Sequence, residues 1–463
     1  MGSKASALDI LPGLKGFGTE TRAAYGAPNP PVICIVANLS NDDQAVIDAN
    51  RNGIPVKTGS LIECINYTPP SGSGKIILFE VSGTIHAEKE PFTYFVDDPY
   101  TTIVGQSAPS PGITLRNIML HVRTNNVLIQ HLRIRIGDAV EGVNPEYRRA
   151  FSVVDATLGR NLFNIVVDHC SFSWGIDINV LASAKYGTGE VRDITYSNNI
   201  FSECLNLSLH SKGHHSKGVA VQHDSENILL SRNLIAHNVD RNPFVRRGKS
   251  AIVNNLIYNP RDQNIILKGT DGDIYASIVG NVIKGGPNSG TNARSLTPIF
   301  WSDLTTTSRI FIDNNKTDTG TQKSASDWSS VKWGGGLSDL SSQVRILTPQ
   351  VWPDNFSAIA STEVEQFIID HAGARPAERD VVDKRVISEV IHRSGRIIDS
   401  PQDVGGWPVL AENRITHILP NNPHGDDDGD GYTNLEEWYH GLAASVERLM
   451  SSPAELKIKS TSS

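Results

Sequence analysis

The stretch NILLSRNLIAHN, residues 227–238, shows the pattern that decides the fold. A run rich in isoleucine and leucine is followed by a polar residue and then by a second short apolar run. The same pattern recurs in FNIVVDHCSFS, RDITYSNNIFSE, SAIVNNLIYN and ASIVGNVIKGG, and the leading isoleucines, at 165, 194, 228, 252 and 278, lie 24 to 34 residues apart. Such a period with strand-type alternation is typical of a solenoid whose coils stack strand on strand. We therefore predict an all-β fold, a right-handed single-stranded parallel β-helix.

Asparagine recurs at the bend between the two apolar halves of each repeat. The positions are Asn199, Asn233, Asn255 and Asn281, and each is followed by an apolar pair. A buried asparagine at a tight turn can bond to the backbone and to its counterpart one coil away. A sandwich of hairpins would instead show two-residue Asn-Gly or Asp-Gly turns, which are scarce in these repeats.

The flanks of the repeats differ from the repeats themselves. Residues 1–74 form an N-terminal region in which a helical stretch near Asp42–Asn52 is expected to cap the exposed strand edge of the first coil. Residues 75–320 form the predicted β-helix domain. Residues 321–463 form a C-terminal extension, and its segment AERDVVDKRVISEVIHRSG has apolar residues at helical spacing.

Composition excludes several classes of protein. The chain has 463 residues and a formal net charge of −8, which disfavours a nucleic-acid partner because phosphate binding needs a broad basic face. No apolar run is long enough to span a membrane. Met-Gly-Ser at the start looks like a cloning remnant, and we expect a secreted or periplasmic protein whose export signal is missing here. Nothing in the sequence demands more than a monomer.

The four cysteines contain no C-x-x-C pair, which argues against a zinc ribbon or a thioredoxin-type site. Cys170 and Cys204 lie in apolar strand-like runs, so we expect buried free thiols. A Cys34–Cys64 disulfide would suit an exported protein, but the spacing alone leaves that pairing open.

The motif DDDGDGYTNLEE in the tail has the spacing of a calcium-binding loop. Asp426, Asp428 and Asp430 occupy alternate positions, Gly431 follows them, and Glu437 falls at the twelfth place. Alternating carboxylates on a tight loop, a turn glycine and a final glutamate suit a hard cation such as Ca²⁺, while the alternative is a solvated acidic turn. The next segment, NLEEWYHGLA, is expected to be a helix. Since no second loop of this kind occurs, a structural clip is favoured over a sensor.

Basic residues gather in the centre of this acidic chain. SLHSKGHHSKG and DRNPFVRRG would lie one coil apart. Together with the next residue they contribute Lys212, Lys217, Arg241, Arg246, Arg247 and Lys249, and the first segment adds His210, His214 and His215. Arginine binds carboxylates with two parallel bonds and lysine acts as a point charge, so the group suits a linear polymer of carboxylates. The alternative is that these cations form surface ion pairs with Asp224, Asp240 or Glu226.

Several segments resemble the pectate lyase family, the first polysaccharide-lyase family, and its longer bacterial members. The pattern R-x-P-x-x-R-x-G is filled by Arg241, Pro243, Arg246 and Gly248. Further similarity lies in NIVVDHCSFSWGID, FEVSGTIH, LPGLKGFG and GRIIDSPQDVGGWP. The resemblance runs from about Leu11 to Glu437. It implies a β-helix enzyme that uses calcium and cleaves polygalacturonate.

The resemblance also implies roles for single residues. Arg241 matches the family's proposed base and Arg246 its carboxylate-binding arginine. Lys217 is the better match for the lysine ahead of the motif, and Lys212 the second choice. Asp177 matches one acidic calcium ligand.

The other acidic position of that calcium site departs from the family pattern. It falls near Ala150, which is flanked by Arg148 and Arg149, so another residue such as Glu146 or Asp138 would have to supply the oxygen.

The implied chemistry is a β-elimination that gives unsaturated oligouronides. It needs a base near C5 of a uronate, neutralisation of the carboxylate and a proton for the leaving oxygen. Lys217, Arg246 and calcium would neutralise charge. Because a guanidinium ordinarily stays protonated, His210 and His214 are alternative acid or base groups, and Arg247 would help to bind substrate.

Other interpretations stay open. A β-helix glycoside hydrolase would need paired carboxylates, for which Asp168 and Asp177 are the available pair. A non-catalytic, adhesin-like module that binds polyanions would explain the missing carboxylate near Ala150. A zinc site would use His210, His214 and His215. Trp174 is expected to be a core aromatic in preference to a sugar platform.

Overall fold

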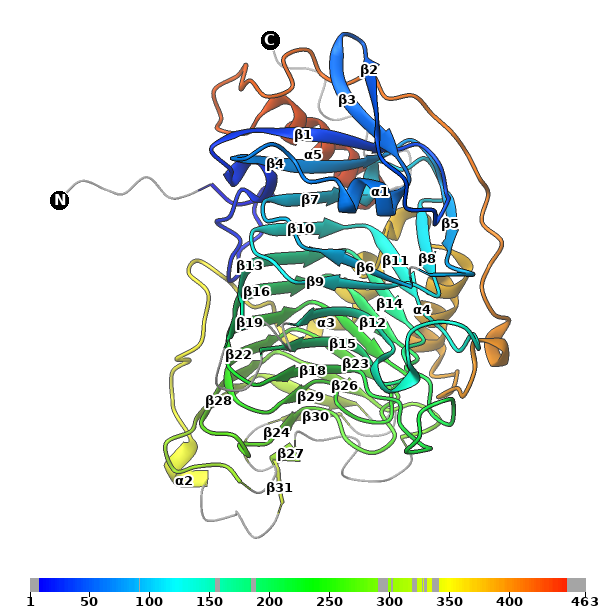
Figure 1. The fold of residues 1–463 in the computed structure, drawn as a ribbon. Coiled ribbons are helices and arrows are strands. Elements are labelled where there is room, and N and C mark those ends of the chain that lie inside the picture. Colours follow the sequence, from blue (N-terminus) through cyan, green and yellow to red (C-terminus); the bar gives the residue numbers. More distant parts are fainter. Residues whose placement is uncertain are drawn as a thin grey trace, which may run out of the picture.

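The computed structural model describes residues 8–90, 92–154, 159–184, 189–289, 299–300, 303–318, 323–326, 328, 331–334 and 341–447. Its strands stack coil upon coil along one axis (Figure 1) and form three sheets in which nearly every neighbouring pair is parallel. The prediction of an all-β parallel β-helix is confirmed. No described helix is long and apolar enough to cross a membrane.

The first sheet contains, in spatial order, β2 (Ile47–Arg51), β3 (Ile54–Gly59), β1 (Asn29–Val36), β4 (Ser73–Phe79), β7 (Thr101–Val104), β10 (Val127–Gln130), β13 (Asn161–Asp168), β16 (Glu190–Ser197), β19 (Ser225–Ser231), β22 (Gly248–Val253), β25 (Ile274–Val279) and β28 (Arg309–Asp313). The second contains β30 (Lys323–Ser326), β29 (Asn315–Asp318), β26 (Val282–Lys284), β23 (Leu256–Tyr258), β20 (Leu234–Ala236), β17 (Ile200–Ser202), β14 (Ser171–Ser173), β11 (Leu132–Arg135), β8 (Ile113–Arg116) and β5 (Gly83–His86). The third contains β31 (Lys332–Trp333), β27 (Ile299–Phe300), β24 (Ile266–Leu267), β21 (Phe244–Val245), β18 (Val219–Gln222), β15 (Ile178–Ser183), β12 (Arg149–Val154), β9 (Met119–Val122) and β6 (Thr93–Val96).

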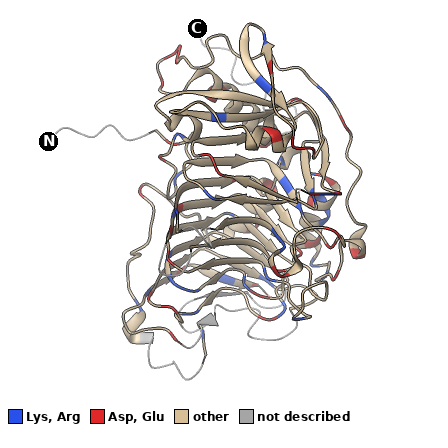
Figure 2. Cartoon of the chain, in the orientation of Figure 1, with Lys and Arg blue, Asp and Glu red and all other residues tan. Residues whose placement is uncertain are grey.

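The isoleucines of the repeat stack in register inside the coils. Ile165 pairs with Ile194, and Ile194 pairs with Ile228. They belong to one continuous buried core that runs between the three sheets. Many charged residues of both signs lie at bends and loops (Figure 2), while the strands bury the apolar surface.

The predicted asparagine ladder is confirmed and extends one coil further. The Nδ2 group of Asn199 donates to Oδ1 of Asn233 at 3.1 Å, and the same bond links Asn233 to Asn255 and Asn255 to Asn281, each at 2.9 Å. Asn281 donates to Asn315 in turn, at 2.9 Å. Each of these amides also bonds to backbone across the bend, so the ladder fixes both the turn and the coil spacing.

The N-terminal cap is built differently from the prediction. The helix expected near Asp42–Asn52 is wrong: β2 and β3 form an antiparallel hairpin there, and the cap helix is α1 (Leu61–Asn66). Asn52 and Gly53 both have positive φ, 42° and 93°, which is the turn that a two-residue hairpin requires.

The Cys34–Cys64 disulfide, which the spacing left open, is present and joins β1 to α1. Cys170 and Cys204 are buried free thiols, as expected. Trp174 is fully buried, as expected for a core aromatic.

Strand pairing also extends beyond the range predicted for the β-helix. It begins at β1, before residue 75, and continues to β31, after residue 320. The three-part division of the chain remains a prediction.

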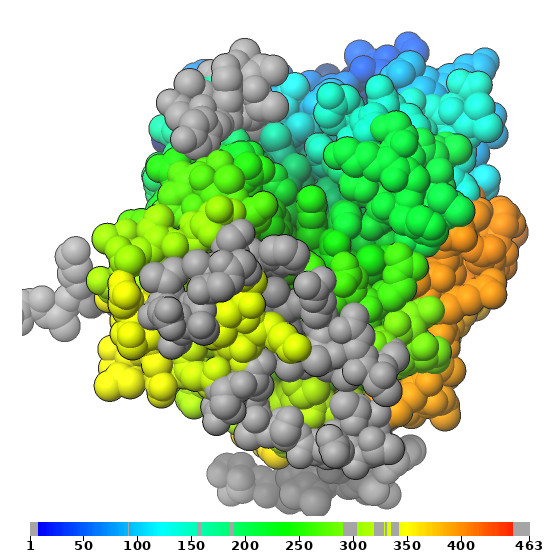
Figure 3. Space-filling model, turned by 90° about the horizontal axis from the view of Figure 1, so that it is seen from below, coloured from blue at the N-terminus to red at the C-terminus, as the bar shows by residue number. Residues whose placement is uncertain are grey.

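The C-terminal extension contains the helices α2 (Ser341–Val344), α3 (Ser361–His371), α4 (Val381–His392) and α5 (Asn434–Glu447). Helices α3 and α4 cover the second sheet, whereas α5 packs on β1 and β4 of the first sheet. The helices predicted around residues 377–395 and 434–443 are confirmed as α4 and α5. Apolar side chains of α3 and α4 pack on outward residues of β17, β20 and β23. Seen from below, the orange part of the extension, around residue 400, lies against one side of the green coils (Figure 3).

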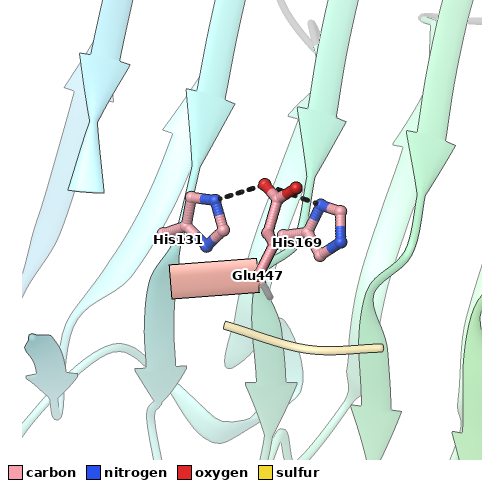
Figure 4. A group of neighbouring side chains, drawn as sticks. All are labelled: His131, His169 and Glu447. Atoms are coloured by element: carbon pink, nitrogen blue, oxygen red, sulfur yellow. Dashed lines mark hydrogen bonds and ion pairs between the residues drawn. The ribbon is translucent and has the colours of Figure 1, made fainter. Parts of the chain in front are cut away.

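Helix α5 is attached to the first coils by a buried ionic cluster (Figure 4). Glu447 accepts a bond from Nε2 of His131 at 3.0 Å and lies 3.6 Å from Nδ1 of His169. The same His169 nitrogen lies 2.7 Å from Asp168. Burial alone would lower the pKa of His169, but the charges of Asp168 and Glu447 outweigh burial and raise it to about 9. His169 is therefore a protonated bridge between two carboxylates.

Replacing Asn233 by alanine tests the ladder. The change removes the acceptor of the buried Asn199 N–H, the side-chain donor to the Tyr196 carbonyl and one of the two donors to Oδ1 of Asn255, so we expect the free energy of unfolding in urea to fall by about 2 to 4 kcal/mol. The exposed Asn421→Ala is the control and should change it by less than about 0.5 kcal/mol. Equal effects of the two changes would show that the ladder does not stabilise the coils.

The His169 bridge predicts a pH-dependent contribution to stability. Its pKa is raised above the unfolded value of about 6.5, so its contribution is complete below that pH and is lost as the pH rises through about 9. His169→Gln should lower the free energy of unfolding by about 3 kcal/mol more at pH 6 than at pH 10. His214→Gln, at an exposed histidine, should show no such difference. Parallel pH profiles for wild type and His169→Gln would refute the bridge.

Candidate active site

A cationic cavity lies on the outward face of the third sheet, where the two predicted basic loops meet. It has a volume of about 330 Å³. The residues that line it are Arg149, Asp177, Ile178, Leu181, Lys212, His215, Gln222, Arg241, Phe244, Arg246 and Lys268. Five of these side chains are cationic and one is a carboxylate, although the whole chain is acidic. The cavity is therefore built to receive an anion.

Parallel stacking places these side chains by register. Val221 pairs with Val245, and Val245 pairs with Leu267, so Gln222, Arg246 and Lys268 follow one another at the same strand end. Two positions before these residues, on the same face of the strands, Ala220, Phe244 and Ile266 form an apolar column beside the cations. The site thus has a charged edge next to an apolar strip.

Arg241 lies at a bend held by the backbone. Its φ is 58°, and its carbonyl accepts a hydrogen bond of 2.7 Å from the Val219 N–H one coil away. The guanidinium lies over the Phe244 ring, with its carbon 5.2 Å from the ring centroid. Among the described residues, no carboxylate forms an ion pair with Arg241, Lys212 or Lys268. These three cations are available to a bound anion.

The ion-pair alternative holds for other members of the basic group. Lys217 pairs with Asp240 at 2.6 Å. Arg247 pairs with Asp224 at 3.1 Å, and Lys249 pairs with Glu226 at 2.7 Å. None of these three cations lines the cavity.

Arg246 differs from Lys217, Arg247 and Lys249 because it lines the cavity and also pairs with a carboxylate. Its Nε lies 2.6 Å from Asp271. Of the three predicted catalytic residues, Arg241 and Arg246 thus line the cavity, and Lys217 lies outside it.

Asp177 is enclosed by nitrogen donors. Oδ2 accepts bonds from Nε of Arg149 at 2.8 Å and from Nη2 at 2.6 Å, while Oδ1 lies 3.4 Å from Nε2 of His215 and 3.9 Å from Nε2 of His210. Burial would raise the pKa of Asp177, but bonds from His215 and Arg149 lower it. Asp177 is thus an ionised carboxylate, with Oδ2 bound by Arg149 and Oδ1 facing the two histidines.

These surroundings do not fit the calcium site that the family resemblance implies. Ca²⁺ takes six to eight oxygen ligands, whereas the oxygen-bearing side chains in the lining are only Asp177 and Gln222. Ala150 is buried, and neither proposed replacement, Glu146 nor Asp138, lines the cavity. Glu146 instead bonds to the Ser211 N–H at 2.9 Å and contacts His210.

The histidines of the basic loop do not assemble the alternative zinc site. His210 and His215 stack with ring centroids 3.8 Å apart and share a cluster with Asp177. His214 is exposed and bonds to Asn206 at 3.0 Å. Nδ1 of His210 accepts the Lys212 N–H at 3.1 Å, so Nε2 keeps its hydrogen and has no lone pair for a metal. Only His215 of the three lines the cavity.

Two functional candidates were missed because their sequence signals are weak. In the sequence Arg149 stands out only as a neighbour of Ala150. In the structure it starts β12 and pairs in register with Ile178, which brings it to Asp177. Lys268 follows a short apolar pair without a motif. Its distance of one coil from Arg246 would have pointed to it, since the two lie at equivalent strand ends.

The carboxylate pair of the hydrolase alternative is not formed. Asp168 lies in the buried cluster with His169 below α5, whereas Asp177 lies in the cationic cavity. Since a glycoside hydrolase needs two carboxyl groups facing one bond, this pair cannot serve.

The tail loop gathers three carboxylates outside the cavity. Asp426, Asp428 and Asp430 are exposed and bring ligand oxygens within 4.8 Å of one another. Asp426 accepts the N–H groups of Gly429 and Gly431, at 2.7 and 2.9 Å, which shapes the loop. The Glu437 carboxylate lies outside this group of three, at the start of α5.

Fold and site together define a parallel β-helix protein with a cationic surface cavity. No family model matches the chain. A protein named probable pectate lyase C from Aspergillus flavus is 26% identical over 461 residues, which cover 95% of this chain and 95% of that protein. A protein of the same name from Neosartorya fischeri is 27% identical over 470 residues, again 95% of both. The resemblance to the pectate lyase family is confirmed over almost the whole chain.

Solved structures support the fold. A mutant pectate lyase from Bacillus subtilis superposes with a TM-score of 0.50 at 18% identity, and covers 81% of this chain and 99% of that one. A pectate lyase bound to a hexasaccharide gives a TM-score of 0.50 at 17% identity, with 80% and 99% covered.

Proposed function

We propose that the chain is a pectate lyase-like polysaccharide lyase, which cleaves polygalacturonate or a related polyuronate by β-elimination and releases unsaturated oligouronides. The observation that carries this proposal is the cavity, in which five cationic side chains face one carboxylate on a chain of net charge −8. The relatives named pectate lyase, similar over 95% of the chain, support the same activity.

The lining residues can divide the work of elimination. Arg246 and Lys268, at equivalent strand ends on neighbouring coils, would hold the carboxylates of the polymer. Holding the carboxylate next to C5 stabilises the enolate-like anion that forms when the C5 proton leaves. Arg241, at its fixed bend, is the base that the family resemblance implies, and His215 is the other acid–base side chain in the lining. Elimination then expels the glycosidic oxygen at C4.

Four of the predicted catalytic or substrate-binding residues lie outside the cavity, and their contact with substrate stays a proposal. Lys217, His210, His214 and Arg247 surround the basic loops without lining the cavity. They would act at neighbouring sugar units or hold the loops through their ion pairs. A purely binding, adhesin-like module is the second candidate, and catalysis distinguishes the two.

Calcium is proposed for the tail loop, where it would act as a structural clip. Asp426, Asp428 and Asp430 would hold the ion together with Glu437 if that carboxylate turned inward. Desolvation and the charges of Asp428 and Asp430 raise the pKa of Glu437, because nearby negative charges disfavour its ionised form. The loop contacts the N-terminal segment, where Tyr432 donates to the Asp9 carbonyl at 2.8 Å.

The Cys34–Cys64 disulfide agrees with secretion or a periplasmic location.

The lyase proposal predicts new ultraviolet absorbance from unsaturated ends when the protein acts on polygalacturonate. Arg241→Ala should lower kcat/KM by at least about 10²-fold, because it removes the proposed base. Lys249→Ala, at a cation that pairs with Glu226 outside the cavity, is the matched control, and its effect should stay within a few-fold. Activity that survives Arg241→Ala would move the base to His215. Binding without any new absorbance would establish the adhesin-like function instead.

The tail loop predicts calcium-dependent stability. Chelator should lower the Tm of the wild type by several degrees, because loss of the ion leaves the clustered carboxylates uncompensated. Asp426→Asn with Asp428→Asn should abolish that response, whereas Asp403→Asn, at an acidic residue outside the loop, should preserve it. An unchanged wild-type Tm with chelator would refute the clip.

A further inference from the structure

We infer that the guanidinium of Arg149 takes the place of a catalytic metal ion in this site, so that the proposed lyase reaction needs no calcium at the cavity. The inference rests on the proposed function and concerns how the same site neutralises its substrate. On this inference, calcium stabilises the tail loop and takes no part in the reaction.

The first argument is that Arg149 already occupies Asp177. Arg149 binds one carboxylate oxygen through two nitrogens, at 2.8 and 2.6 Å, and His215 faces the other at 3.4 Å. Both members of the Arg149–Asp177 pair are mostly buried, with side chains 16% and 17% exposed. A partly buried, charge-assisted pair of this geometry is stronger than a surface contact. A cation would have to displace it to reach the carboxylate.

The second argument is the charge of the lining. Besides Arg149, the cavity holds Lys212, Arg241, Arg246 and Lys268, and Asp177 is its one carboxylate. A divalent cation placed there would be repelled by several fixed positive charges. The anionic substrate is attracted by the same charges, so the site favours the polymer and disfavours the ion.

The third argument is the donor capacity of Arg149. A guanidinium has five N–H groups, and two of them are used on Asp177. The remaining three are available to the cavity, which Arg149 lines. Asp177 holds the guanidinium in position, and the free donors can bind a substrate carboxylate with two parallel bonds. Arg149 is thus a proposed substrate-contacting residue, and Asp177 is its positioning residue.

The first test is lyase activity on polygalacturonate in excess chelator at 25 °C, with circular dichroism of the same samples to show that the chain is folded. We expect the wild type to retain at least half of its calcium-supplemented rate. Arg149→Ala should lose at least about 10²-fold in kcat/KM under both conditions. Arg123→Ala removes a similar bidentate pair, with Asp97, away from the cavity, and should stay within twofold. A folded wild type that chelator inactivates and calcium restores would overturn the inference.

Two further variants protect the test against simple misfolding. Arg149→Ala leaves Asp177 without its main partner, so the double variant Arg149→Ala with Asp177→Ala removes the whole pair and should fold but remain inactive. Arg149→Lys keeps the charge and should recover at least tenfold over Arg149→Ala. A double variant with wild-type activity would contradict a role for Arg149 in the reaction.

A binding measurement separates this inference from the lyase proposal. Calorimetric titration of chelator-treated protein with calcium, alone and with trigalacturonate present, should give one site per chain, which the Asp426→Asn and Asp428→Asn changes remove. A second calcium site that persists in that variant would overturn the inference. If the wild type produces no unsaturated ends under any condition, the lyase proposal fails, while the calcium count still decides whether Arg149 excludes a metal.

Discussion

The in-register parallel pairing of each coil with the next is the constraint on which the rest of the structure depends. Backbone hydrogen bonds join Ile228 to Ile194 and Ile194 to Ile165, so every side chain lies directly above or below the equivalent side chain one coil away. Inside the coils this register produces the apolar core and, at the bend, the asparagine ladder. Outside, it brings residues far apart in the sequence, such as Arg246 and Lys268, to one place on the surface.

The concentration of cations is tolerated because much of it is balanced nearby. Asp240, Asp271 and Asp224 each pair with a cation of the basic group, at 2.6, 2.6 and 3.1 Å. Such pairs lower the repulsion that would otherwise oppose folding. Within the cavity the balance is left incomplete at Lys212, Arg241 and Lys268, and a carboxylate polymer would complete it. The proposed chemistry of the site therefore depends on these three cations, for which the described residues provide no carboxylate partner.

The sequence predicts the parts of this molecule that repeat. A period of isoleucines and a recurrent asparagine predict the coils, the ladder and the convergence of the two basic loops, since stacking converts sequence period into spatial neighbourhood. The cap was predicted with the wrong element, because the local Asn52-Gly53 turn overrode the helical spacing around it.

Site details were predictable only where a motif exists. The motif arginines Arg241 and Arg246 reach the cavity, but the partners Asp271 and Arg149 could not be assigned. Whether a charged side chain pairs with a nearby carboxylate or faces solvent depends on distances of about an ångström. The period of the coils does not determine such distances. For the same reason Lys217 looked like a cavity residue and is paired with Asp240.

The attachment of α5 bears on how the chain matures during synthesis. Each coil pairs with the one before it, so coils can be added in order as the polypeptide emerges. The clamp on the first coils cannot follow that order: Arg22 binds Glu436, a contact between residues 414 positions apart, and His131 binds Glu447. Until the last residues have been translated, the outer face of β1 and β4 that Leu435 and Tyr439 cover is bare. A nascent β-helix whose coils are complete before α5 is made would therefore expose apolar surface at its N-terminal coils. A chaperone, or a second chain, could bind there.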